Sequence, residues 1–378
     1  MPESYALVVF SHLRWDFVFQ RPQHLLSRLA QRHRILFIEE PIHQPDTEPH
    51  WQRTSPVANV TVARLHTPEP APAFHDAHVA TIDALVPALL RDEGIDSYVL
   101  WLYTAQALPH AQALAAAHAP QAVVYDCMDE LSAFLHAPRE LLDREAALLA
   151  WADLVFTGGP SLYEAKRHRH PHAYCFPSSV DAAHFRGAQA AIPEAEDQAA
   201  LPHPRLGFYG VIDERFDVPL LAELAAAHPE WQIVLVGPVV KIDQDDLPRS
   251  PNIHYMGMRS YDHLPSYLAG WNVCLLPFAL NDATRFISPT KTLEYMAAER
   301  PIVSTPITDV VQPYGEIVYI GAGPQGFIAM CEQALAATAD ERERRFVAMR
   351  HVLAQTSWER TVQSMETLID KVVAARIA

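Results

Sequence analysis

The sequence predicts an α/β protein made of two tandem domains, each with a parallel sheet covered by helices on both faces. Its 378 residues exceed the roughly 250–300 that one hydrophobic core usually serves. Short apolar runs alternate with amphipathic stretches in two separate blocks, which is the pattern of parallel sheets with crossover helices. Between the blocks, residues 186–204 are rich in Ala, Pro, Glu and Gln and show no sustained apolar period. We expect this stretch to be a linker.

The first block, residues 1–185, predicts short strands separated by helices such as 22–33 and 138–151. The strands are expected at residues 6–10, 35–38, 60–65, 98–102, 122–125, 154–156 and 174–176. We therefore expect one complete parallel-sheet domain here.

The second block, residues 205–356, repeats the pattern. Strands are expected at residues 206–209, 233–236, 253–256, 273–276 and 302–304, and helices at 219–227, 262–269, from 289 onward, 327–337 and 341–353. A last helix is expected at residues 357–376. Together with the linker, this gives four segments: 1–185, 186–204, 205–356 and 357–378.

Charge and composition exclude several classes of protein. The formal net charge of −16 disfavours nucleic acid as a partner, since capture of a polyanion needs a basic face. The first ten residues are too short and too acidic for a signal peptide, and no apolar run approaches the length of a bilayer span. We therefore expect a cytoplasmic protein. Cys127, Cys175, Cys274 and Cys331 are scattered, which predicts reduced thiols that pack in or near the core.

Ligands of parallel sheets bind at the carboxyl ends of the strands, so the loops there carry the functional signal. The first loop, residues 11–15, contains no glycine, which argues against an NAD or FAD enzyme. The loop after residues 122–125 contains Asp126, Asp129 and Glu130. Crowded carboxylates raise one another's pKa, which suits a general base. Asp126 or Asp129 as a simple turn cap remains an alternative.

The segment 288–294, Ser-Pro-Thr-Lys-Thr-Leu-Glu, follows the predicted strand 273–276 and opens a predicted helix. Ser288 is a good N-cap and Pro289 fits the first helical position. The N–H groups of residues 290–292 would then face an anion at the helix start.

Lys291 adds a full positive charge at this helix start, and Glu294 lies three residues further on the same face. These features predict a site for a diphosphate, with Glu294 placed to accept hydrogen bonds from ribose hydroxyls. The alternative is a surface ion pair between Lys291 and Glu294, which would contribute about 0.3–0.5 kcal/mol.

Residues 288–303, SPTKTLEYMAAERPIV, resemble the donor-binding segment of GT-B glycosyltransferases of the large family 4. Residues 231–238, WQIVLVGP, and 252–257, NIHYMG, follow the same order as in that family. The early stretches 11–15, SHLRW, and 20–25, QRPQHL, are similar to a branch that includes teichuronic-acid glycosyltransferases. The resemblance extends over nearly the whole chain.

This resemblance implies a GT-B fold, in which two Rossmann-like domains are followed by a C-terminal helix that crosses back to the first domain. The acceptor, a glycolipid or polysaccharide, would bind in the first domain. A nucleotide-diphosphate sugar, with UDP favoured, would bind in the second as co-substrate, without a cofactor or a metal. We interpret Asp243-Gln244-Asp245 as surface rather than a metal motif. The expected donor-binding residues are Gly210, Gly237, Met256, Gly257, Arg285, Ser288, Pro289, Thr290, Lys291, Thr292 and Glu294.

Two positions depart from the family pattern. The family's pair of glutamates is reduced to Glu294, since the first position is Phe286, and its Arg and Lys after the first strand of the second domain are missing from residues 210–215. A more distant resemblance, to the xanthan glucuronosyltransferase, aligns Asp129 with a catalytic aspartate and Lys291 with a nucleotide-binding lysine. It implies an inverting reaction with Asp129 as base. His12 is the alternative base.

Three further hypotheses are compatible with the sequence. One is a nucleotide-sugar 2-epimerase, which shares the fold and needs no acceptor. Another is an inactive glycosyltransferase-like binding protein, suggested by Phe286 and the missing basic residues. The third is weak peripheral contact with a membrane through basic residues. These lie in residues 166–170 and in the first helix and its end, namely Arg21, His24, Arg28, Arg32, His33 and Arg34.

Overall fold

The computed structural model describes residues 5–135, 137–189 and 192–377 of the chain. The first four residues, part of the segment found above to be too short and too acidic for a signal peptide, lie outside the described residues. Residues 190–191 of the expected linker, residue 136 and residue 378 also lie outside them. The chain divides into two compact units. The first comprises residues 1–177 and 359–378, and the second comprises residues 178–358.

The first unit contains an eight-stranded sheet in the order β3-β4-β2-β1-β5-β6-β7-β8. Its strands are β1 (Ala6–Ser11), β2 (Ile35–His43), β3 (His50–Val57), β4 (Val60–Thr67), β5 (Tyr98–Leu102), β6 (Ala122–Cys127), β7 (Leu154–Thr157) and β8 (Ala173–Cys175). All neighbours are parallel except β3 and β4. β1, β5 and β6 are buried along their whole length, which explains their continuous apolar sequences.

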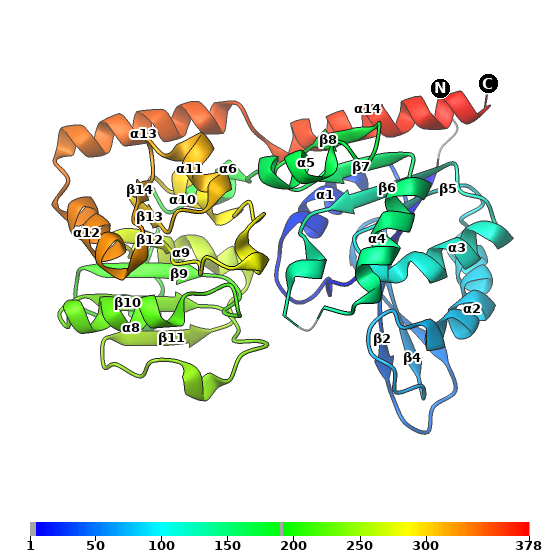
Figure 1. The fold of residues 1–378 in the computed structure, drawn as a ribbon, viewed down its shortest axis with the longest axis horizontal. Helices are drawn as coiled ribbons and strands as arrows, with labels where there is room; N and C mark the ends of the chain where they lie inside the picture. The colour runs from blue at the N-terminus through cyan, green and yellow to red at the C-terminus, as the bar shows by residue number, and fades with distance from the viewer. Residues whose placement is uncertain (1–4, 136, 190–191, 378) are drawn as a thin grey trace. The chain divides into compact units, whose positions relative to one another are not determined.

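The helices of the first unit are α1 (Arg21–Leu29), α2 (Val79–Asp92), α3 (Leu108–Ala117), α4 (Glu140–Trp151), α5 (Pro160–Lys166) and α14 (Trp358–Ile377), with short 3-10 turns at Asp76–His78, Ala105–Ala107 and Leu131–Ala133. From residue 359 onward, α14 belongs to this unit and lies along its elements (Figure 1). Its Asp370 accepts a hydrogen bond from Tyr5 at 2.8 Å, and its Arg376 is paired with Asp153 at 2.7 Å. The last helix is therefore an integral part of the first unit.

The second unit contains a six-stranded parallel sheet in the order β11-β10-β9-β12-β13-β14. Its strands are β9 (Arg205–Tyr209), β10 (Gln232–Val236), β11 (Ile253–Gly257), β12 (Val273–Leu276), β13 (Ile302–Ser304) and β14 (Tyr319–Ile320). The strand order reverses between β9 and β12, and such a switch point is where open α/β sheets bind their ligands.

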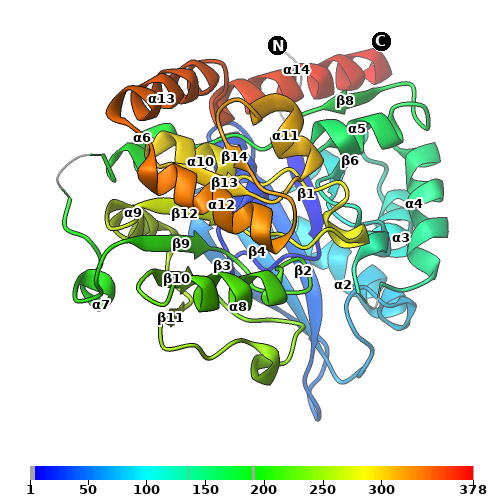
Figure 2. The same cartoon turned by 60° about the vertical axis from the view of Figure 1, so that its left-hand side comes forward.

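The helices of the second unit are α6 (Ala182–Arg186), α7 (Glu196–Ala199), α8 (Val218–Ala227), α9 (Leu264–Ala269), α10 (Lys291–Ala297), α11 (Thr308–Tyr314), α12 (Gly323–Ala336) and α13 (Ala339–Ala354), with 3-10 turns at Gln244–Asp246, Tyr261–His263 and Asp282–Thr284. Figure 2 shows α8 and α12 in front of the sheet, and α12 packs against α8 and the strands β12 and β13. The predicted α/β class with two parallel-sheet domains is confirmed.

The linker expected at residues 186–204 is wrong in part, because the chain from Ser178 onward belongs to the second unit. Gln198 is fully buried. Its side-chain amide donates to the carbonyl of Tyr267 at 2.9 Å, and its side-chain oxygen accepts from Trp271 Nε1 at 3.0 Å. Despite its polar composition, this segment is therefore held by specific hydrogen bonds as well as by apolar contacts of Ala188, Ala195 and Leu201 with the core.

The edge strand β3 was not predicted. All of its side chains are exposed or half-buried, so no apolar alternation marks it in the sequence. Among the described residues, no helix combines the length and the apolar character needed to cross a membrane.

Candidate functional site

The carboxyl ends of β9 and β12 bring Gly210 and Lys291 into direct contact. Gly210 follows β9 and has a φ of 131°, a conformation that other residues rarely adopt. A Cβ atom at this position would lie 2.3 Å from Lys291 Cε and 2.7 Å from its Nζ. The lysine side chain therefore lies across the bare Cα of Gly210, which only glycine permits.

Two aromatic rings surround the Lys291 ammonium. Its Nζ lies 5.3 Å from the ring centroid of Phe208 and 5.8 Å from that of Phe278, within the range of cation–π attraction. Phe208 belongs to β9 and Phe278 follows β12. The charge is thus fixed at the switch point of the sheet, where an anion would be bound.

Gly237, at the end of β10, allows the loops after β9 and β10 to meet. Its φ is 145°, and a Cβ on it would lie 2.0 Å from the carbonyl oxygen of Gly210. The N–H groups of both glycines are used within the fold, that of Gly210 by Val236 O and that of Gly237 by Gly257 O, each at 2.8 Å. The two glycines thus allow the backbones of the two loops to approach each other closely, and the positive charge comes from Lys291.

Glu294 lies one turn beyond Lys291 on α10 and is buried. Its Oε2 accepts a hydrogen bond of 2.5 Å from the hydroxyl of Tyr209. Burial raises the pKa of Glu294 to about 6, while the Tyr209 hydrogen bond and the charge of Lys291 lower it. The alternative of an exposed surface ion pair is therefore wrong, because this carboxylate is buried and bonded to a tyrosine.

The start of α10 differs from the prediction. The helix begins at Lys291 with Thr290 as its N-cap residue, rather than with Ser288 as N-cap and Pro289 as first residue. The N–H of Thr292, expected to face an anion, instead donates to the carbonyl of Pro289 at 3.1 Å. This hydrogen bond closes a tight turn before the helix. It uses an N–H group that the sequence pattern had left available for an anion.

The remaining residues predicted to bind the sugar donor lie in the same loops but make fewer specific contacts. Ser288, Pro289 and Thr290 are half-buried before α10. The side chain of Thr292 is buried, and among the described residues its Oγ1 has no hydrogen-bond partner. The Arg285 guanidinium lies 5.1 Å from the ring of Phe286, the position that departs from the family pattern.

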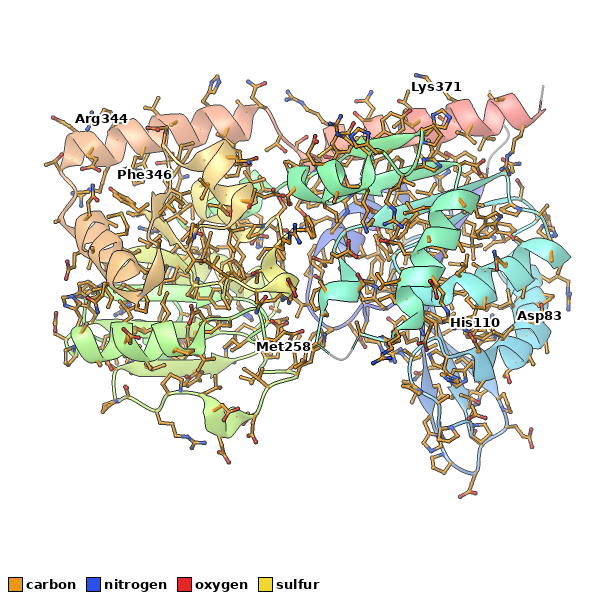
Figure 3. All side chains as sticks on the ribbon, viewed as in Figure 1. Asp83, His110, Met258, Arg344, Phe346 and Lys371 are labelled. Carbon is orange, nitrogen blue, oxygen red and sulfur yellow. The ribbon has the colours of Figure 1, made fainter. Side chains whose placement is uncertain are left out.

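β11 ends in the predicted pair Met256 and Gly257. Met256 packs against the hydrophobic core, while the next methionine, Met258, is exposed (Figure 3). Asp243, in the loop after β10, accepts a hydrogen bond from the N–H of Asp245 at 2.9 Å, and Asp245 forms an exposed pair with Arg249.

In the first unit, the loop after β6 carries the predicted base Asp129, which is half-buried. Its two acidic neighbours are each paired with a cation. Fully buried Asp126 accepts bonds from Arg21 at 2.9–3.2 Å, and Glu130 lies 2.6 Å from Lys166. The pKa of Asp126 is raised as predicted, but by burial rather than by its acidic neighbours, and a cation offsets each of the carboxylates beside Asp129.

The loop after β1 carries the alternative base His12, also half-buried. A buried carboxylate that sequence reasoning missed, Glu39 of β2, organises this loop. It accepts from the N–H of Trp15 at 2.7 Å and is paired with Arg14 at 3.2 Å and Arg64 at 2.6 Å. The structure thus brings Gly210, Lys291 and Glu294 together, and it places Asp129 and His12 on loops at the carboxyl edge of the other sheet.

Known proteins resemble this chain in sequence and in fold. Residues 204–337 match the family described as glycosyl transferases group 1. A Bacillus subtilis (strain 168) protein, TuaH, provisionally named as a glycosyltransferase of teichuronic acid biosynthesis, is 31% identical over 157 residues. This alignment covers 40% of the chain and 39% of TuaH, so the chain spans about two fifths of the length of that relative.

Solved structures match over almost the entire chain. Sucrose-phosphate synthase from Thermosynechococcus elongatus superposes with a TM-score of 0.72 at 16% identity, covering 98% of this chain and 100% of its own. The E. coli trehalose-6-phosphate protein bound with UDP-2-fluoro glucose gives a TM-score of 0.68 at 14% identity, covering 97% and 99%. At these identities the likeness establishes the fold. The chain thus has the GT-B fold, and its residues 204–337 match the glycosyl transferases group 1 family.

Proposed function

We propose that this chain is a glycosyltransferase that moves a sugar from a nucleotide-diphosphate sugar to a glycan or lipid-linked acceptor. The observation that carries the proposal is the Lys291 ammonium lying against Gly210, with the Glu294 carboxylate one turn away on α10. A cation and a carboxylate at this spacing match a diphosphate joined to a ribose. UDP is the favoured nucleotide, since the similar E. coli structure holds UDP-2-fluoro glucose.

The reaction follows from these groups. The acceptor hydroxyl attacks the anomeric carbon, the bond from that carbon to the diphosphate oxygen breaks, and the hydroxyl proton passes to a base. Lys291 stabilises the negative charge that develops on the leaving diphosphate. Asp129 is the proposed base and His12 the alternative, and direct displacement inverts the anomeric configuration.

Affinity for the nucleotide tests the donor site. Replacing Lys291 by Ala removes a charge-assisted contact, so UDP binding should weaken by about 1.5–3 kcal/mol, with the fold intact by circular dichroism. Lys371→Ala, which removes an exposed lysine of α14 in the first unit (Figure 3), is the matched control and should bind UDP normally. Calorimetric titration with UDP, GDP and ADP also identifies which nucleobase the donor carries. Unchanged UDP affinity in Lys291→Ala with lowered thermal stability would make Lys291 structural.

Two rival functions give different results in a turnover assay. A 2-epimerase would convert the sugar of its donor without any acceptor, whereas a transferase releases sugar only to an acceptor. An inactive binding protein would bind a nucleotide and catalyse neither reaction. Assays with the matched donor, with and without a lipid-linked acceptor, therefore separate the three.

A cytoplasmic location with weak contact at the inner membrane face is the remaining part of this proposal. The structure weakens its charge argument, because Lys166 is buried rather than solvent-facing. Arg28 and Arg32 are also paired with Glu359 and Glu366 of α14. Co-sedimentation with anionic vesicles at low salt tests it, and binding that persists with neutral lipid or at high salt contradicts an electrostatic contact.

A further inference from the structure

Tyr209, the last residue of β9, is joined to Glu294 across 85 residues of sequence. Its hydroxyl donates to Glu294 Oε2 at 2.5 Å, and both side chains are buried, with exposed fractions of 4% and 6%. A buried carboxylate needs a hydrogen-bond donor to stay charged. The tyrosine hydroxyl supplies that donor.

The surrounding aromatic residues fix the Tyr209 ring. Tyr295 lies edge-on to it at 5.1 Å, Trp271 lies at 6.1 Å, and Phe185 is stacked at 6.3 Å between centroids. The backbone N–H of Tyr209 also donates to the hydroxyl of Tyr295 at 3.3 Å. The ring contacts, which a phenylalanine at position 295 would keep, give the Tyr209 hydroxyl and the carboxylate that it bonds a defined direction.

We propose that Tyr209 is a positioning residue for the donor, whose hydroxyl holds the Glu294 carboxylate charged and oriented for the ribose hydroxyls. This inference rests on the proposed function of the site. An ionised carboxylate offers about four lone-pair positions, so the one bond from Tyr209 leaves acceptor capacity for both hydroxyls of a ribose. A neutral carboxyl would present a proton instead and lose part of that capacity.

The charge state of Glu294 depends on the groups that face it. Burial raises its pKa to about 6, and Tyr209 from β9 and Lys291 from its own helix oppose that rise. Cys274 of β12 contributes instead to the raised pKa values of Tyr209 and Tyr295. On the helices packed against α10, Arg350 of α13 pairs with Glu299 and His184 of α6 stacks on Tyr261. Loss of the Tyr209 hydroxyl should therefore raise the pKa of Glu294 into the neutral range.

Tyr209→Phe tests the proposal, with Tyr295→Phe as its matched control. Both substitutions remove one hydroxyl from a buried ring, but only that of Tyr209 bonds Glu294. The Glu294 carboxyl is titrated by ¹³C NMR without ligand and assigned by its absence in Glu294→Gln. We expect the midpoint to rise by about 1–2 units in Tyr209→Phe and to stay in place in Tyr295→Phe.

UDP affinity measured between pH 5 and 9 gives the functional readout. In Tyr209→Phe, the pH at which UDP binding is half-maximal should move up with the carboxyl midpoint, so that binding is reduced about tenfold at pH 6.5 and recovers at pH 9. The role of Tyr209 is overturned if the titration midpoint of the Glu294 carboxyl stays unchanged in Tyr209→Phe. It is also overturned if the pH dependence of UDP binding does not follow that midpoint. Failure of the unsubstituted protein to bind UDP would contradict the proposed function instead, while the ligand-free titration still decides whether Tyr209 sets the charge of Glu294.

Discussion

Lys166 joins α5 to the loop after β6 through a buried ammonium. Its Nζ lies 2.6 Å from Glu130 and 2.7 Å from both carboxylate oxygens of Glu145 on α4. Glu130 directly follows Asp129, so this ion pair holds the loop that presents the proposed base.

Replacing Lys166 by Met should therefore cost stability and turnover together. Loss of this buried cation removes the partner of Glu130 and leaves Glu145 with Arg169, and breaking a buried ion pair typically destabilises a protein by about 3–5 kcal/mol. Turnover should fall while UDP affinity, which is proposed to depend on the second unit, is kept. Arg167→Met is the neighbouring control, since its exposed pair with Glu164 contributes about 0–1 kcal/mol. Urea unfolding and steady-state rates measure both effects, and full turnover in Lys166→Met would dismiss the loop-anchoring role.

Substitution of Gly210 by Ala tests the contact with Lys291. Strain at a positive φ should destabilise the protein by at least about 1–2 kcal/mol, and the new methyl group should displace the lysine and weaken UDP binding. Gly323 also has a positive φ, of 65°, but open space around the Cβ position. Gly323→Ala should thus lose stability and keep UDP affinity. Equal UDP affinities in the two variants would argue against a role for the contact.

Asp129→Asn should reduce turnover by about 100-fold to 10,000-fold, the usual contribution of a general base. Donor affinity should stay near normal. His12→Ala, measured under saturating donor, is the comparison that separates the two candidate bases, and NMR of the product gives the anomeric configuration. A retained configuration, or an asparagine variant that keeps most of its turnover, rules out the inverting assignment to Asp129.

Glu294→Gln should weaken binding of intact UDP while leaving the affinity for inorganic pyrophosphate nearly unchanged, because the carboxylate is assigned to the ribose. Calorimetry with both ligands checks this. Equal losses for UDP and pyrophosphate would exclude the ribose role.

The same substitution should have a pH-dependent effect on stability. The pKa of Glu294 is raised from its usual 4.5 to about 6, so the fold favours the protonated carboxyl. Its contribution to stability is complete below pH 4.5 and is lost as the pH rises through about 6. Glutamine stays neutral, so the stability of Glu294→Gln relative to the unsubstituted protein should increase by up to about 2 kcal/mol between pH 4 and pH 8. Urea unfolding at the two pH values measures it, and a constant difference would contradict a raised pKa.

The sequence predicted the fold, and the place of Lys291 and Glu294 beside a strand end, because both depend on local patterns. Buried strands such as β5 and β12 are continuous apolar runs, and residues 288–294 come shortly after one of them. A helix does begin in this segment, although at Lys291 rather than at Pro289, so Lys291 and Glu294 could be assigned to one end of the sheet.

Long-range partners could not be predicted in this way. Tyr209 and Glu294 are 85 residues apart, and Arg21 meets Asp126 across 105 residues. No local period or spacing relates such residues, because only the packing of whole elements brings them together. For the same reason, the acidic run 126–130 suggested repulsion where the fold supplies a cation to each neighbour of Asp129.

The return of α14 to the first unit affects the order in which the chain can fold during synthesis. The second unit, residues 178–358, is continuous in sequence, whereas the first unit needs residues 359–377 to complete it. Until that helix has left the ribosome, Tyr5, Arg28 and Asp153 lack the partners that it provides. The unit made first is therefore completed last, and the second unit can reach its native state ahead of it.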